Sequence, residues 1–139
     1  MSYLLDTCLI SEATKPKPNA AVIEWIRGAE PESLYVSVLS LGEIERGVER
    51  LGEGQRKRHL RIWLEQVREE SAGRVLGIDD RVATEWGRMS ARAEARGEIL
   101  PVIDALLGAT AAVHGLTIVT RNTSDLVRTG APILDPWAP

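Results

Sequence analysis

Four acidic residues stand at the edges of apolar segments, and they are the residues of this sequence best suited to chemistry. Asp6 directly follows the apolar run Tyr3-Leu4-Leu5, and Glu43, Asp104 and Asp125 follow or open later apolar segments. Carboxylates without a lysine or histidine in the same stretches suit a hard cation with oxygen ligands, Mg²⁺ or Mn²⁺. Such an ion can polarise a phosphoryl oxygen and lower the pKa of a bound water. The acids therefore favour a metal-assisted hydrolytic site.

Each acid also has a purely structural explanation. Asp6 could cap the helix that follows it, and Glu43 could complete a capping box with Ser40. Asp104 could stand in a first helical turn because that position favours an anion, and Asp125 could stabilise the turn 122–125. However, a carboxylate that opens an otherwise apolar helix is costly unless it is paired or coordinates a metal. We therefore favour one shared site for all four.

The elements that must position these acids alternate along the chain. Short runs rich in β-forming residues are followed by segments of helical periodicity that end at glycine or proline. This alternation predicts one α/β domain over residues 1–139, with a central, mostly parallel sheet of about five strands and helices on both faces. The expected strands are 3–5, 34–38, 74–78, 116–120 and 131–134, and the expected helices are 7–13, 19–28, 40–51, 55–71, 79–97 and 102–114. In such a sheet the functional crevice lies at the carboxyl ends of the strands, where Asp6 is expected.

Composition narrows the classes of function. The net charge is −3, so no global basic field marks a nucleic-acid-binding protein, and any contact with a polyanion must be local. Arg121, beside the expected site, is a better candidate for such a contact than the basic helix face around residues 56–61, which is usually just solvated. With a single cysteine, no signal-like N-terminus and no long apolar run, we expect a cytoplasmic protein with no membrane segment.

Four motifs, in this order and spacing, resemble those of a known family. They are Leu4-Leu5-Asp6-Thr7, Leu41-Gly42-Glu43, Pro101-Val102-Ile103-Asp104-Ala105 and Thr120-Arg121-Asn122-x-x-Asp125. They resemble the PIN-domain ribonucleases, and most closely the VapC toxins of bacterial toxin–antitoxin pairs in their FitB-like branch. The segments around Arg96-Gly97, His114-Gly115-Leu116 and Pro136-Trp137 also resemble that branch. The resemblance covers nearly the whole chain.

The resemblance implies a PIN fold and an Mg²⁺- or Mn²⁺-dependent endoribonuclease that acts as a toxin. It implies metal ligation by Asp6 and Asp104, supported by Glu43 and Asp125. It also implies a cognate antitoxin that blocks the site, a homodimer, and a larger hetero-oligomer with the antitoxin. Substrate contacts are expected from neighbours of these acids, namely Thr7, Thr120, Arg121 and Asn122. One position departs from the family pattern, because Cys8 stands where the family usually has asparagine.

Two other classes of function compete with this interpretation. A phosphatase with an aspartate nucleophile needs a second aspartate two residues after the first, and Cys8 occupies that position. A nucleotide-binding loop is disfavoured because Gly52-x-Gly54 lacks a third glycine and follows a helix. The remaining alternative is a PIN-like binding module whose acidic pocket captures a basic peptide. Ribonuclease assays with metal and with a chelator separate that module from the enzyme.

Overall fold

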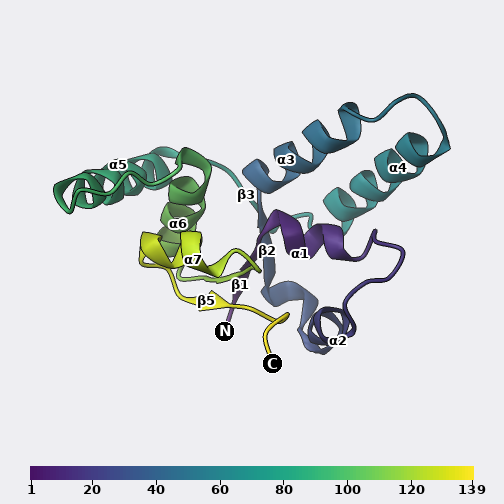
Figure 1. The fold of residues 1–139 in the computed structure, drawn as a ribbon, viewed down its shortest axis with the longest axis horizontal. Coiled ribbons are helices and arrows are strands. Elements are labelled where there is room, and N and C mark those ends of the chain that lie inside the picture. Colours follow the sequence, from purple (N-terminus) through teal and green to yellow (C-terminus); the bar gives the residue numbers. More distant parts are fainter.

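The computed structural model describes all of residues 1–139 and has five short parallel strands at its centre (Figure 1). The strands lie in the order β3-β2-β1-β4-β5, so β1 is central, and every neighbouring pair is parallel. In the register of the sheet, Leu5 of β1 lies between Val36 of β2 and Val119 of β4. The strands are β1 (Tyr3–Leu5), β2 (Leu34–Ser37), β3 (Val75–Leu76), β4 (Thr117–Val119) and β5 (Ile133–Leu134). The predicted α/β architecture with a parallel sheet is confirmed.

Helices cover both faces of this sheet. In Figure 1 α1 and α2, with α3 and α4 beyond them, lie on one side of the strands, and α6 and α7 lie on the other, with α5 outermost. The helices are α1 (Thr7–Glu12), α2 (Ala20–Gly28), α3 (Val38–Glu49), α4 (Gln55–Glu70), α5 (Asp80–Ala95), α6 (Val102–His114) and α7 (Thr123–Leu126). Two 3-10 turns, η1 (Pro31–Ser33) and η2 (Val127–Thr129), complete the chain. No helix combines the length and apolar character needed to span a membrane.

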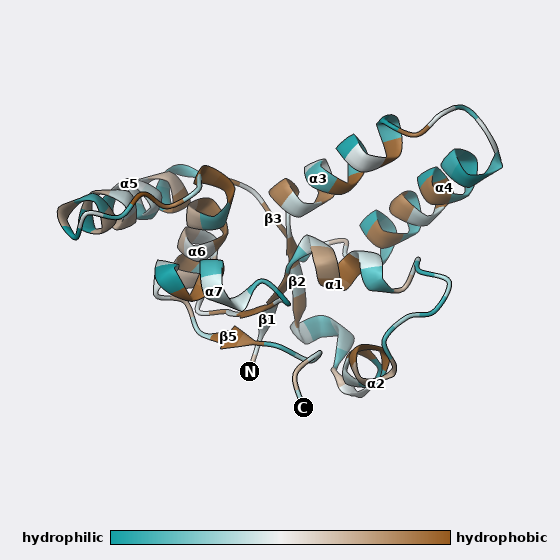
Figure 2. Cartoon of the chain, viewed as in Figure 1, coloured by the Kyte–Doolittle hydropathy of each residue, from teal (hydrophilic) through white to brown (hydrophobic).

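Alternation along the strands explains the two layers. Leu4 of β1 packs with Leu107 of α6, whereas its neighbours Tyr3 and Leu5 pack on the cluster around Leu9 and Val22, on α1 and α2. Successive side chains of a strand point to opposite faces, so each short strand supplies both layers. Figure 2 shows the strands as largely hydrophobic and the outer sides of the helices as largely hydrophilic. The core therefore consists of two thin layers on either side of β1 and β4.

Helix α6 joins the sheet to the outer helix α5. Ala105 and Ala109 face Val82, Met89 and Ala93 of α5 in one buried cluster. On another side of α6, a Cβ at Gly108 would lie only 2.4 Å from the Cβ of Thr129, so only glycine permits this approach. The small residues of α6 thus bring its first turn, which carries Asp104, close to the segment that carries Asp125.

Most helix ends are those that the sequence predicts. The side chains of Asn19 and Asp79 accept hydrogen bonds from the backbone N–H groups of Val22 and Val82, and Gly115 ends α6 in the left-handed conformation. The start of α3 differs from the prediction. The side chain of Ser37 caps this helix by accepting from the N–H of Leu39 at 3.0 Å, so the helix begins before Ser40. The sequence also missed α7, which forms where a simple turn was expected.

Candidate active site

Three of the four predicted acids line one cavity at the carboxyl ends of β1 and β4. The cavity has a volume of about 550 Å³. Asp6 follows β1, Glu43 comes from α3, and Asp104 comes from the first turn of α6. The lining residues are Asp6, Thr7, Cys8, Glu43, Ile103, Asp104, Leu107, Arg121 and Asn122. Three acids that are far apart in the sequence therefore face one space.

Asp6 is held in place through both of its carboxylate oxygens. The backbone N–H of Thr7 donates to Oδ1 at 2.8 Å, so Asp6 does cap α1. The hydroxyl of Thr120 donates to Oδ2, also at 2.8 Å, from the end of β4. A carboxylate with two such donors has a fixed orientation, because both hydrogen bonds restrict its rotation. Asp6 therefore caps a helix and lines the cavity at the same time.

Glu43 has a tertiary hydrogen-bond partner and does not form the capping box that was its purely structural alternative. Its Oε1 accepts a hydrogen bond at 2.8 Å from the hydroxyl of Thr7. The capping box is wrong because Ser40 is buried inside α3 and its hydroxyl makes no hydrogen bond. The bond from Thr7 ties the first turn of α1 to α3 and aims Glu43 at the cavity.

Asp104 is close enough to the other three acids for their charges to affect its pKa. Burial raises the pKa of its carboxyl, and the negative charges of Asp125, Asp6 and Glu43 raise it further, while Arg128 lowers it. Asp125 lies in α7 and does not line the cavity itself, so it acts on Asp104 through its charge. The raised pKa is thus the result of partial burial first and of neighbouring like charges second. Groups perturbed in this way are enriched at functional sites.

The donor chemistry of the cavity fits a divalent cation. Asp6, Glu43 and Asp104 offer carboxylate oxygens, and no histidine or lysine lines the cavity. No three acidic, histidine or cysteine side chains are already arranged around one point as a metal cage. Mg²⁺ needs no such cage, since it is commonly bound by one or two carboxylates and retains several waters. The oxygen donors present are therefore of the kind and number that this ion uses.

The expected substrate contacts divide into accessible and buried residues. Thr7, Arg121 and Asn122 line the cavity, as a substrate contact must. Thr120 is fully buried, which corrects its expected role, because a buried hydroxyl that is bonded to Asp6 cannot reach a substrate. The same hydroxyl accepts the backbone N–H of Asn122 at 2.9 Å. Thr120 is thus a positioning residue for Asp6 and for the loop after β4.

Cys8 fills the position where the resembled family usually has asparagine. Its sulfur accepts the backbone N–H of Arg121 at 3.5 Å and lies 3.8 Å from Oδ2 of Asp6. Its distance from the hydroxyl oxygen of Thr120 is 3.6 Å. These are weak bonds, but they connect α1 to the loop after β4. The thiol therefore keeps the two segments in contact at this position.

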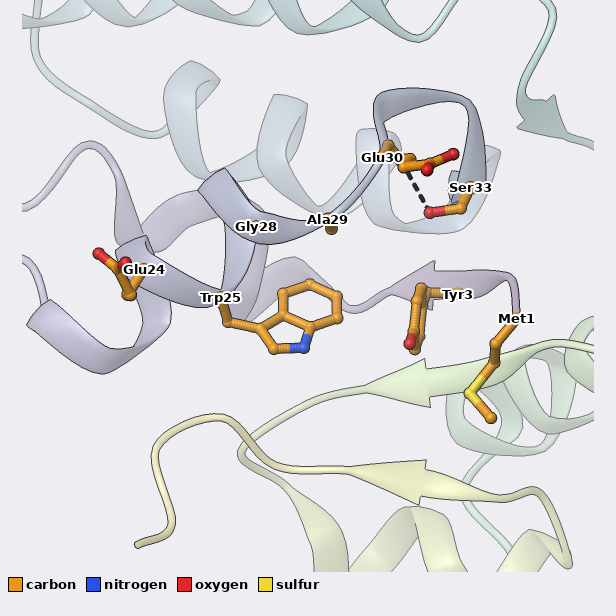
Figure 3. Close-up of a pocket in the computed structure, with 8 residues that line it drawn as sticks. All are labelled: Met1, Tyr3, Glu24, Trp25, Gly28, Ala29, Glu30 and Ser33. Carbon is orange, nitrogen blue, oxygen red and sulfur yellow. Dashed lines mark hydrogen bonds between the residues drawn. The ribbon is translucent and has the colours of Figure 1, made fainter.

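A second hollow of about 500 Å³ lies at the opposite, amino-terminal edge of the sheet. Figure 3 shows Tyr3 and Trp25 side by side in it, and their ring centroids are 5.0 Å apart in an edge-to-face arrangement. Its two acidic residues, Glu24 and Glu30, lie on different sides of the hollow in Figure 3. No set of charged groups converges there, so the candidate active site is the cavity that contains Asp6 and Asp104.

Known proteins resemble this chain over nearly its whole length. The family model described as PIN domain matches residues 3–131. The toxin FitB of Neisseria gonorrhoeae is 34% identical over 135 residues, which are 96% of this chain and 97% of FitB. The VapC ribonuclease Y4jK of Sinorhizobium fredii is 34% identical over 137 residues, or 98% of each chain. The crystal structure of FitAcB from Neisseria gonorrhoeae matches with a TM-score of 0.93 and 33% identity, covering 99% of both chains.

Proposed function

The chain belongs to the PIN-domain family and, within it, to the toxin–antitoxin ribonucleases FitB and VapC, and from this premise we propose that it is a metal-dependent endoribonuclease. The observation that carries the proposal is the convergence of Asp6, Glu43 and Asp104 in one cavity. Asp125 lies outside the lining and acts on Asp104 through its negative charge. The substrate class is RNA, and the reaction is hydrolysis of a phosphodiester bond.

In the proposed reaction the chain binds the cation and fixes the substrate. Asp6 and Asp104 would hold Mg²⁺ or Mn²⁺, with Glu43 and Asp125 in support. The bound cation would polarise a phosphoryl oxygen and lower the pKa of an attacking water. Thr120 and the N–H of Thr7 keep Asp6 oriented, and Arg121 and Asn122 stand at the rim where an RNA phosphate would lie.

Cleavage of a labelled single-stranded RNA, in Mg²⁺, in Mn²⁺ and in EDTA, tests this proposal. We expect activity with either metal, none in EDTA, and recovery when Mn²⁺ is restored. The products should carry 5′-phosphate and 3′-hydroxyl ends, because no histidine lines the cavity to deprotonate the 2′-hydroxyl and water is the nucleophile. Full activity in EDTA, or 2′,3′-cyclic phosphate ends, would contradict the proposal. Binding of a basic peptide, together with no cleavage of RNA under any of these conditions, would favour a binding module.

We also propose that a basic antitoxin protein is its partner. The related FitAB and FitAcB structures are toxin–antitoxin complexes at 32% and 33% identity to this chain. An arginine side chain of such a partner could pair with the carboxylates and compete with the cation, since Arg forms two parallel hydrogen bonds to a carboxylate. We further propose that the chain forms a homodimer and a larger hetero-oligomer with the antitoxin.

Co-expression with a candidate antitoxin provides a direct measurement. We expect the purified complex to have a mass above that of two chains of 15.3 kDa and to show no ribonuclease activity. Removing the partner should restore the activity and leave a dimer. A partner that co-purifies without inhibiting cleavage, or an active monomer at micromolar concentration, would count against these assemblies.

A further inference from the structure

Arg121 stands between the acidic cavity and the C-terminal tail. Its backbone follows β4 and is fixed by the bond from its N–H to Cys8, while its side chain is exposed and lines the cavity. The carboxylates of Asp6, Glu43 and Asp104, which line the same cavity, attract a free guanidinium inward, where it would compete with a cation. If the Arg121 guanidinium is to bind a phosphate at the rim of the cavity, a second interaction must keep it away from the carboxylates.

Trp137, in the C-terminal tail, provides that interaction. The guanidinium carbon of Arg121 lies 5.1 Å from the centroid of the Trp137 ring, within cation–π distance. Asp135 fixes the turn before the ring, because its Oδ1 accepts the N–H of Trp137 at 2.9 Å. The ring packs against the buried cluster of Leu9, Val22 and Val119. The indole surface is thus anchored to the core and offers a fixed platform to Arg121.

Glu12 is a buried acid on α1 with close partners of its own. The Glu12 carboxylate is only 2% exposed. Its pKa is lowered first by the bond from the N–H of Asn19 and also by the positive charges of Lys15 and Arg121, against the opposing effect of burial. Glu12 forms its ion pair with Lys15 at 3.0 Å, so the charge of Arg121 acts on it only at longer range. The cation–π contact with Trp137 is therefore the close contact that holds Arg121.

We propose that Trp137 is a positioning residue that holds Arg121 at the rim of the acidic cavity, where Arg121 binds a phosphate of the RNA next to the scissile bond. This inference rests on the proposed ribonuclease function. The buried indole N–H of Trp137 makes no hydrogen bond within the chain. Replacement of the Trp137 ring therefore removes its cation–π contact with Arg121 without breaking a side-chain hydrogen bond.

Fluorescence anisotropy of a labelled single-stranded RNA tests this contact, with Asp104→Asn present in every protein so that no RNA is cleaved. We expect Trp137→Leu to raise the dissociation constant about 3- to 10-fold, and Trp137→Phe to have a smaller effect because phenylalanine is a weaker cation–π partner. Trp25→Leu is the matched control. Trp25 packs on the same cluster but pairs with Tyr3 and no cation, so its loss should leave RNA affinity unchanged.

A double-mutant cycle with Arg121→Gln separates positioning from general stability. In that background Trp137→Leu should have no further effect on RNA affinity, since the group it positions is gone. An equal loss in both backgrounds, or an equal loss from Trp25→Leu, would overturn the inference. If Trp137→Leu melts at too low a temperature to assay, the same cycle with Trp137→Phe decides. Absence of RNA binding in the protein that carries only Asp104→Asn, together with no cleavage by the unmodified chain, would overturn the proposed function itself.

Discussion

Replacing Asp104 with asparagine should abolish RNA cleavage, by about a thousandfold or more, while leaving the folded protein at least as stable as before. Asn keeps the shape of the side chain but removes one of four like charges. In the absence of metal, the unmodified chain carries the cost of burying the Asp104 charge and the repulsion of the other acids, which together raise the pKa of Asp104. The variant should therefore melt at an equal or higher temperature, and Mg²⁺ or Mn²⁺ should raise its melting temperature less than that of the unmodified chain.

The pH dependence of this difference follows from the direction of the pKa shift. The pKa of Asp104 is raised above the ordinary value of 3.8, so the native state binds its proton more tightly than the unfolded state does. Stability from this group is therefore present at low pH and is lost as the pH rises from about 4 through the folded-state pKa. The stability advantage of Asp104→Asn should be smallest near pH 4 and should grow toward pH 7.

Asp80→Asn is the matched control for this prediction. Asp80 also lies in the first turn of a helix, α5, but it does not line the cavity. If Asp104 only favoured the helix N-terminus, both variants would lose about 0.3–1 kcal/mol and neither would change the response to metal. Melting curves of the three proteins, with and without metal, distinguish the two explanations. A destabilised Asp104→Asn with an undiminished metal response would remove Asp104 from the site.

Replacing Thr120 with valine should lower cleavage about 10- to 100-fold, although this side chain does not reach the cavity. Valine has the same shape and loses only the hydroxyl that donates to Asp6 and accepts from the N–H of Asn122. Groups that orient a metal ligand typically change metal affinity or activity by about this factor. Stability should fall by about 1–3 kcal/mol, because the Asp6 carboxylate and the N–H of Asn122 each lose a hydrogen bond.

Two further variants isolate the hydroxyl of Thr120. Thr120→Ser keeps it and should retain most of the activity, although the lost methyl group lowers stability. Thr110→Val is the matched control, because Thr110 is also fully buried and its hydroxyl donates only to the backbone of Leu106. It should leave cleavage and metal affinity unchanged. A Thr120→Val protein with full activity, or a Thr120→Ser protein as impaired as the valine variant, would show that the hydroxyl does not position Asp6.

The sequence alone was enough to find the acids, the order of the elements and the family. Asp6 and Asp104 stand beside apolar segments, and Asn19, Asp79 and Gly115 mark helix ends through interactions within a few residues. Such local signals are readable because the interacting groups are close in the sequence. The family match over residues 3–131 confirms the resemblance that the four motifs indicate.

Tertiary structure alone decided which side chains hold the acids. Thr120 and Asp6 are 114 residues apart, and Thr7 and Glu43 are 36 residues apart, so no local pattern links either pair. The same holds for Arg121 and Trp137, which meet only because β4 and the tail after β5 pack on one cluster. Ser40 shows that a local signal can also mislead. The sequence suggests that it caps α3, but Ser37 is the cap and Ser40 is buried inside the helix. Spacing identifies which residues can do chemistry, but their orientation depends on hydrogen bonds and packing between segments that only the folded chain brings together.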